Sequence, residues 1–251
     1  MEPTIRQGQA EWVSFFKSVR FFLGHASLLG WGILLAMLTC LLTWLAFHFG
    51  LKFILQLTGD FFLTPPPAES VWGWVKYGGW QLTRFLFHLT AQIVTFYLAF
   101  LLAFSLTTPG YAFLSRAVEC KLKNRIAGQG FSVQSVCRDL AEGAKIGLFG
   151  VLVAAVSLAA GFIPLIGPAA VLVIYTYYSA LMLIDYPASQ RNWTLGRKIN
   201  WLLRHNRAAF KLGFLPALIG MIPIFNIFLI ALIFPMMTVH AALNFSAIEN
   251  Q

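Results

Sequence analysis

Charged residues are scarce in this sequence. Only 11% of its 251 residues are Asp, Glu, Lys or Arg, whereas hydrophobic residues make up 59% and the mean hydropathy is +0.73. Soluble domains carry about 25% charged residues, so the deficit excludes an ordinary soluble protein. The composition predicts an integral membrane protein.

Acidic residues are the scarcer of the two signs. Nine Asp and Glu stand against 18 Lys and Arg, which gives a net charge of +9. A basic excess also occurs in nucleic-acid-binding proteins, but here the basic residues adjoin apolar runs, where the anionic headgroups of a lipid bilayer are the expected partner. The sequence therefore predicts contact with anionic lipid and none with nucleic acid.

Residue patterns typical of catalysis or metal binding are also missing. The three cysteines form no CxxC pair, and His48, His88 and His240 have no His, Cys or carboxylate partner at ligand spacing. The sequence contains no nucleophile–base pair, Gly-rich phosphate loop or Walker motif. We therefore expect no metal, no cofactor, no enzymatic activity and no ATP-driven pumping. The N-terminal segment lacks the apolar core of a signal peptide, so no cleaved signal is expected.

Long charge-free runs, by contrast, are abundant. Residues 27–51 and 85–106 can each cross a bilayer, which takes roughly 20 apolar residues. Residues 1–26 carry apolar and charged side chains at helical spacing, which predicts an amphipathic helix in the headgroup plane. Between the two spans, the triple proline and the Trp and Tyr residues of 53–81 predict a loop and a surface-lying helix. Pro109 is expected to break or kink the second span.

A third apolar run, residues 145–187, is interrupted by Pro164 and Gly167, so two helices and a turn fit it better than one span. The legs 146–160 and 169–184 have 15 and 16 residues, each about 23 Å at 1.5 Å per residue, against a hydrocarbon core of about 30 Å. This segment is therefore predicted to be a re-entrant hairpin, which enters the membrane and returns to the same side.

Residues 211–248 repeat this pattern, with Pro223 and Asn226 at the turn. The first leg, 212–220, has nine residues, roughly 14 Å, and Pro216 weakens it further. The Asn226 side chain is expected to cap freed backbone groups, the alternative being a role in permeation. Backbone exposed at a hairpin tip needs cover inside a membrane, so at least a homodimer is predicted.

The segment between the hairpins, residues 191–211, alternates basic and apolar residues, which predicts an amphipathic helix on the membrane surface. If both hairpins return, only Lys52, Lys76 and Arg84 of the 18 basic residues lie opposite the two termini, which places the termini in the cytoplasm. The sequence thus predicts a single membrane domain and an all-α integral membrane protein. It would have two long transmembrane helices, two partly inserted hairpins and amphipathic interfacial helices.

Several short motifs carry a resemblance to a known family. They are the turns Ile163-Pro164-Leu165-Ile166-Gly167 and Ile222-Pro223-Ile224-Phe225-Asn226, the Asp185-Tyr186-Pro187 triplet, and Pro109 followed by a charged helix. Together they resemble the CysZ-type sulfate permeases and the wider etoposide-induced membrane-protein family. The resemblance implies a protein of the bacterial inner (cytoplasmic) membrane that takes up sulfate for cysteine synthesis. It also implies two long helices and two partly inserted helical pairs.

One departure from the sulfate permeases concerns the anion site. Their Gly-hydrophobic-Arg-Arg motif near the start of the first long helix corresponds here to a stretch from His25 to Leu29 that has no arginine. Arg20, His25 and Ser27 can form a weaker polar mouth for the anion at this helix start. The alternative is an ordinary interfacial helix start.

Other polar residues allow two interpretations in the same way. Asp185, Arg204 and Arg207 can guide an anion, or they can form an ion-pair network that caps the hairpins. Two hypotheses for the whole chain stay open. The first is a permease or channel for a small oxyanion, most of all sulfate, working without ATP hydrolysis; the second is a non-transporting membrane scaffold that shapes the bilayer.

Overall fold

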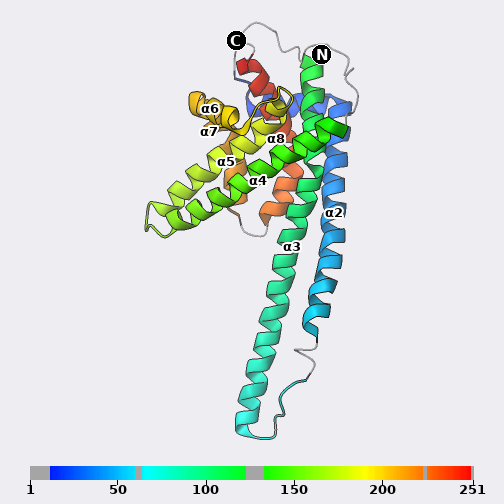
Figure 1. The fold of residues 1–251 in the computed structure, drawn as a ribbon, viewed down its shortest axis with the longest axis vertical. Helices are drawn as coiled ribbons and strands as arrows, with labels where there is room; N and C mark the ends of the chain where they lie inside the picture. Colours follow the sequence, from blue (N-terminus) through cyan, green and yellow to red (C-terminus); the bar gives the residue numbers. More distant parts are fainter. Residues whose placement is uncertain (1–11, 60–63, 123–132, 223–224, 250–251) are drawn as a thin grey trace. The chain divides into compact units, whose positions relative to one another are not determined.

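The structure is a computed structural model. It describes residues 12–59, 64–122, 133–222 and 225–249, without the side chains of 133–140 and 225–228. The described residues form eight α-helices and no strand (Figure 1). In chain order these are α1 (Phe15–Gly24), α2 (Ala26–Thr58), α3 (Val71–Leu122), α4 (Val133–Gly161), α5 (Gly167–Ser189), α6 (Leu195–Arg204), α7 (Asn206–Gly220) and α8 (Phe225–Glu249).

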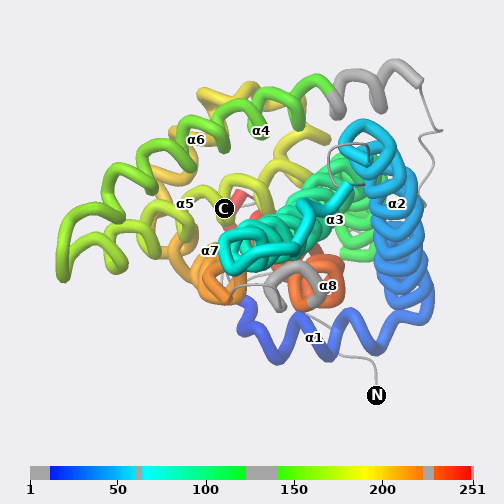
Figure 2. The backbone as a smooth tube through the Cα atoms, turned by 90° about the horizontal axis from the view of Figure 1, so that it is seen from below, coloured from blue at the N-terminus to red at the C-terminus, as the bar shows by residue number. Residues whose placement is uncertain are grey.

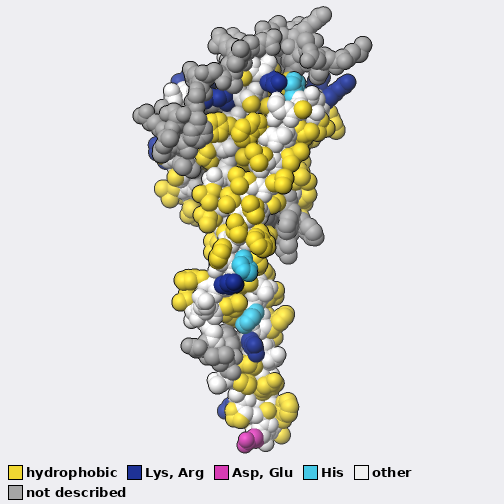
Figure 3. All heavy atoms as spheres, turned by 90° about the vertical axis from the view of Figure 1, so that its right-hand side faces the viewer, with side chains coloured by type: hydrophobic (Ala, Val, Ile, Leu, Met, Phe, Trp, Pro, Cys, Tyr) yellow, Lys and Arg dark blue, Asp and Glu magenta, His cyan; other side chains and the backbone are white. Residues whose placement is uncertain are grey.

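Five of these helices contain segments that are long and apolar enough to cross a bilayer. They are Ala26–Thr58, Val71–Leu122, Ala141–Gly161, Gly167–Ser189 and Leu229–Glu249. Figure 3 shows hydrophobic side chains over much of one face of the molecule, where a soluble protein would carry charged groups. The fold is therefore that of a multi-pass α-helical membrane protein, as the composition predicted.

The chain divides into two compact units. One comprises Met1–Met37 and Thr107–Gln251, and the other comprises Leu38–Leu106. Within the second unit α2 packs on α3, where the Phe47 ring meets the Phe96 ring edge-on at a centroid distance of 5.9 Å. A Cβ on Gly50 would lie 3.0 Å from the Thr95 methyl group, so the glycine allows the two helices to approach closely.

Helix α8 forms the core of the first unit. In the apolar stretch of α8 that is long enough to cross a membrane, 72% of the residues are buried, whereas in the corresponding stretch of α4 only 17% are buried. α8 contacts α1, α5 and α7, and the Phe234 ring also meets Tyr111 of α3 at 4.9 Å (Figure 2). α4 is peripheral by comparison. Its exposed apolar side chains include Leu148, Val151 and Leu158, which therefore face lipid or a partner.

The closest helix crossing in this unit joins α5 and α7. Gly213 of α7 lies so near α5 that a Cβ would overlap the Thr176 carbonyl oxygen and reach within 2.8 Å of the Ala180 backbone nitrogen. Both neighbouring atoms belong to the backbone and cannot rotate away. Only glycine fits this position, and the contact holds the two helices side by side.

The predicted turn of the first hairpin lies between α4, which ends at Gly161, and α5, which begins at Gly167 (Figure 1). A Cβ on Gly167 would lie 2.8 Å from the Ala160 carbonyl oxygen, so a larger residue would collide with the backbone. Leu165 has a φ of 67°, a conformation that favours glycine, and its side chain is 97% exposed. The tip thus carries an exposed apolar side chain on a strained backbone.

Helix α3 corrects two predictions. It runs unbroken from Val71 to Leu122, so residues 71–81 are the first turns of a long helix and not a separate surface helix. Pro109, expected to break or kink the span, lies inside this helix. Proline removes one backbone hydrogen bond, but Tyr111 and Leu114 just beyond it are fully buried, and packing of this kind can keep the chain helical. At 52 residues α3 is about 78 Å long, so part of it lies beyond a bilayer of about 45 Å.

The legs of the predicted hairpins are longer than the sequence indicated. α4 has 29 residues and α5 has 23. The predicted legs were shorter because they were bounded by charged residues, whereas a helix can continue through turns that carry charge. Helix length therefore does not show that these legs stop short of crossing, and re-entry stays a prediction. α7 begins at Asn206, not Leu212, and runs through Pro216 for 15 residues, about 23 Å.

Two amphipathic segments also differ from their predictions. Residues 191–211 form no single surface helix, because α6 ends at Arg204 and α7 begins at Asn206. In α1, which was expected to lie in the headgroup plane, the side chains of Ser18, Phe21 and Phe22 are buried. α1 packs on α8, so part of its apolar face is used inside the protein.

Candidate functional site

Lys198 lies fully buried in the first unit, with no exposed surface. α6 begins at Leu195 and buries three residues on one face, Lys198, Trp201 and Leu202, at the i, i+3, i+4 spacing of a helix. The lysine thus occupies the inner stripe of an otherwise basic, exposed helix. The sequence interpretation placed it on the membrane surface, and that placement is wrong.

The Lys198 ammonium binds two residues near the end of α5. Its Nζ lies 2.5 Å from Asp185 Oδ1 and donates a second hydrogen bond to Ser189 Oγ at 3.1 Å. Ser189, one turn after Asp185, donates its hydroxyl hydrogen to the same carboxylate at 3.0 Å. The three side chains form a closed, charge-assisted triangle that fastens α6 to α5.

A second carboxylate completes the cluster from α4. Glu142 Oε2 lies 4.0 Å from Lys198 Nζ, within ion-pair range but too far for a hydrogen bond. Glu142 Oε1 accepts a hydrogen bond from Lys145 at 2.6 Å, whereas Oε2 is buried without a hydrogen-bond partner among the described residues. We call Glu142, Asp185, Ser189 and Lys198 the buried ion cluster; Lys145, whose side chain is 60% exposed, pairs with Glu142 at its edge. Its two carboxylates balance two ammonium groups.

The rest of the Asp185-Tyr186-Pro187 triplet is buried as well. The Tyr186 hydroxyl is hydrogen-bonded to the Thr108 side chain, and its ring lies 5.9 Å from Tyr111 and 6.0 Å from Phe234. Pro187 lies inside α5, near its end. The triplet therefore joins α5 to α3 and α8 beside the buried ion cluster.

The partner predicted for Asp185 was wrong. Arg204 and Arg207 have exposed side chains, and the carboxylate pairs with Lys198. The pairing links residues 13 positions apart on different helices, which no local pattern reveals. One signal was available within α6: Lys198 lies three residues before Trp201 and four before Leu202, whereas Arg197 and Arg204 have such a spacing to Trp201 alone.

The residues predicted to bind the anion lie at the junction of α1 and α2. His25 ends α1, and its Nδ1 donates a hydrogen bond to the Phe21 carbonyl oxygen at 2.8 Å. Arg20 and Ser27 are exposed. The structure therefore uses one nitrogen of His25 to close a helix end, and the role of the three residues toward an anion stays a prediction.

The remaining motif residues belong to the two predicted hairpin turns. Pro164 and Gly167 form the turn between α4 and α5, as described above. Pro223 and the side chain of Asn226 lie outside the described residues, so their roles at the second turn stay predictions.

A second buried polar cluster was missed by the sequence interpretation. His240 Nδ1 lies 2.7 Å from the Ser18 hydroxyl. Asn244 accepts a hydrogen bond from the Val13 backbone N–H at 2.9 Å and donates one to the Val13 carbonyl at 3.2 Å. Sequence spacing could not pair these groups, because more than 220 residues separate them. They fasten the start of α1 to α8.

Neither polar cluster is a metal site. Within the part of the chain that the structure describes, no three His, Cys, Asp or Glu side chains gather where they could hold a metal ion. The buried ion cluster has instead a lysine at its centre. Burying ionisable groups is expensive unless they pair, and here Lys198 pairs with the carboxylates of Asp185 and Glu142.

The five apolar helices define a polytopic α-helical membrane protein, within which the buried ion cluster joins α4, α5 and α6. The sequence profile of the sulfate transporter CysZ/etoposide-induced protein 2.4 family matches residues 14–231, and the chain belongs to this family. The resemblance drawn from the proline turns and the Asp-Tyr-Pro triplet is thereby confirmed. No curated protein matches the chain significantly.

Proposed function

We propose that the protein is a permease or channel that moves a small oxyanion, most of all sulfate, without ATP hydrolysis. The observation that carries the proposal is Lys198, a fully buried cation between two carboxylates in a family described as sulfate transporters. An ammonium group is a suitable ligand for an oxyanion, which Lys198 would bind in exchange for the Asp185 carboxylate that pairs with it in this structure.

Lys198 has the capacity to bind an anion. An ammonium group has three N–H donors, and only Asp185 and Ser189 among the described residues accept hydrogen bonds from it. In this mechanism the Asp185 pair holds α5 and α6 together in the anion-free state. An oxyanion that takes the place of the carboxylate on Lys198 releases the two helices and opens a route. Lys198 would then supply part of the charge that the missing arginine pair provides in the sulfate permeases.

The proposed setting is the bacterial inner membrane, with both termini in the cytoplasm and at least two copies of the chain. The distribution of basic residues supports this orientation. The exposed apolar tip at Leu165 supports insertion of the first hairpin into lipid, because a strained, fully exposed leucine is unsuited to water. Cysteines introduced as V75C and H205C should be accessible to a thiol reagent from opposite sides of the membrane in intact cells. Accessibility of both from the same side would contradict the orientation.

Uptake of radiolabelled sulfate into proteoliposomes tests the function directly. Wild type should accumulate sulfate without nucleotide, and K198M should lose uptake, while K198R retains part of it. K17M, which removes an exposed lysine, is the matched control and should transport like wild type. A well-folded wild type that moves no sulfate, sulfite or thiosulfate would refute the permease.

The alternative of a bilayer-shaping scaffold is favoured by the exposed apolar face of α4 and the exposed basic residues Arg197, Arg204 and Arg207. A scaffold would change vesicle curvature in electron micrographs without passing any oxyanion. The same proteoliposomes therefore decide between the two functions.

A further inference from the structure

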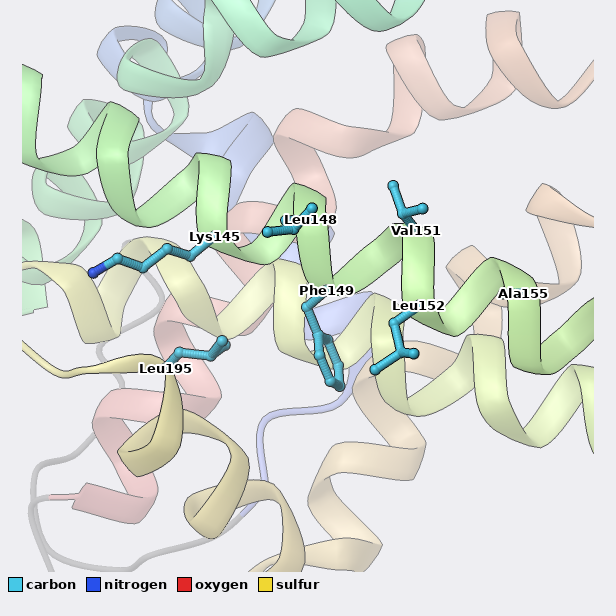
Figure 4. A pocket seen from close by; sticks show the side chains of 7 residues that line it. All are labelled: Lys145, Leu148, Phe149, Val151, Leu152, Ala155 and Leu195. Carbon is cyan, nitrogen blue, oxygen red and sulfur yellow. The ribbon is translucent and has the colours of Figure 1, made fainter.

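An apolar groove lies between α4 and the start of α6, with a volume of about 650 Å³. Figure 4 shows its lining side chains, among which Phe149 and Leu152 point to the same side of α4. The Lys145 ammonium lies at one end of the row (Figure 4). The lining residues are Lys145, Leu148, Phe149, Val151, Leu152, Ala155 and Leu195. The groove therefore combines an apolar trough with a single cation at one end.

Lys145 is available to a ligand. Its side chain is 60% exposed, and Glu142 accepts one hydrogen bond from its ammonium at 2.6 Å. Two of its three donors remain for another acceptor. The remaining lining residues carry no polar side chain, so a ligand that fills the groove must be apolar along its length and anionic at one end.

The dimensions fit one acyl chain. From Lys145 to Ala155 the α4 axis rises about 15 Å, half of a hydrocarbon core of about 30 Å, which is the depth of one leaflet. The volume lies within the range of pockets that hold small ligands, about 300–1,000 Å³. We propose that the groove binds a phospholipid with an anionic headgroup, its acyl chain along α4 and its phosphate on Lys145.

A second copy of this chain is the less suitable occupant. Apolar side chains on a partner would fill the trough but leave Lys145 without an added counter-charge. An anionic phospholipid satisfies both features at once, and the cytoplasmic leaflet of a membrane contains such lipids. The inference concerns lipid binding and is independent of whether the protein transports an oxyanion.

Native mass spectrometry of the full-length purified protein tests the site. The protein is equilibrated with an equal mixture of dioleoyl phosphatidylglycerol and dioleoyl phosphatidylcholine in detergent, and the lipids retained per chain are counted. The wild-type protein should retain more phosphatidylglycerol than phosphatidylcholine. K145Q should lower this preference about fivefold, since one basic residue contributes about that factor near an anionic lipid. K145R should keep the preference.

Two further variants separate the groove from general effects. A155W fills the trough and should reduce retention of phosphatidylglycerol, whereas L101W, at an exposed apolar position of α3, should not. K17Q is the control for loss of a basic residue. Equal retention of the two lipids by wild type, or an unchanged preference in K145Q, would overturn the proposal. The proposal would also be overturned if A155W altered the oligomer mass but left lipid retention unchanged, because a second copy of the chain would then occupy the groove.

Discussion

Replacing Lys198 with methionine removes the cation at the centre of the buried ion cluster but keeps a side chain of similar length. The change leaves the Asp185 and Glu142 carboxylates, whose side chains are only 9% and 16% exposed, without that counter-charge. Breaking a buried pair in this way costs about 3–5 kcal/mol. We take the lower value, about 3 kcal/mol, because both carboxylates retain some contact with solvent.

A loss of this size is measurable. For chains of 150–250 residues, each kcal/mol shifts Tm by about 2–4 °C, so K198M should melt about 6–12 °C below wild type. Circular dichroism of the detergent-solubilised protein follows the transition. The exposed-lysine control K17M should stay within about 2 °C of wild type, as surface substitutions usually change stability by less than about 0.5 kcal/mol.

A double variant distinguishes a lost ion pair from a packing defect. K198M/D185L replaces both charged groups with apolar ones, and buried ion pairs replaced in this way often lose no stability. Its Tm should recover most of the loss seen in K198M, while sulfate uptake should stay absent. The inference would be wrong if K198M melted at the same temperature as K17M. It would also be wrong if the fall in Tm of the double variant equalled the combined falls of K198M and D185L.

Two other substitutions test the packing of the first unit. G213A places a methyl group against the Thr176 backbone and should lower the free energy of unfolding by about 1–3 kcal/mol, which is measured as a lower Tm. The control G220A, where open space surrounds the new methyl group, should not destabilise the protein. Equal Tm values for the two variants would contradict the close helix crossing. N244A leaves the buried Val13 backbone N–H without its acceptor and should lower the free energy of unfolding by about 1–3 kcal/mol. It should also make α1 more sensitive to limited proteolysis. If α1 of N244A resisted the protease as well as α1 of wild type, the link would be dispensable.

The helical, membrane-embedded character of the chain could be predicted from its charge-free runs, because a bilayer strongly constrains composition. The family followed from short motifs at proline turns. Helix ends were less predictable. α3 continues through Pro109 and α7 through Pro216, because contacts from other helices compensate for the backbone hydrogen bond that proline removes.

The buried clusters were beyond local reasoning. Lys198 looked like one of several basic residues on an amphipathic helix, and only the position of α5 shows that it faces Asp185. His240 looked isolated because its partner, Ser18, lies 222 positions earlier. Such pairs depend on how helices are arranged in three dimensions, and the spacing of residues along one helix carries little information about them.

The burial of α8 has a consequence for how the protein is made. The ribosome delivers α1 first, yet Asn244, which binds Val13, is synthesised 231 residues later. At about 5–20 residues per second, α1 is exposed for roughly 10–50 s before its partner helix leaves the ribosome. During this interval the early helices must be held by lipid or by a chaperone, so the first unit can close only when α8 inserts. Changes near the end of α8 should therefore affect the yield of assembled protein more than changes of the same size in α2.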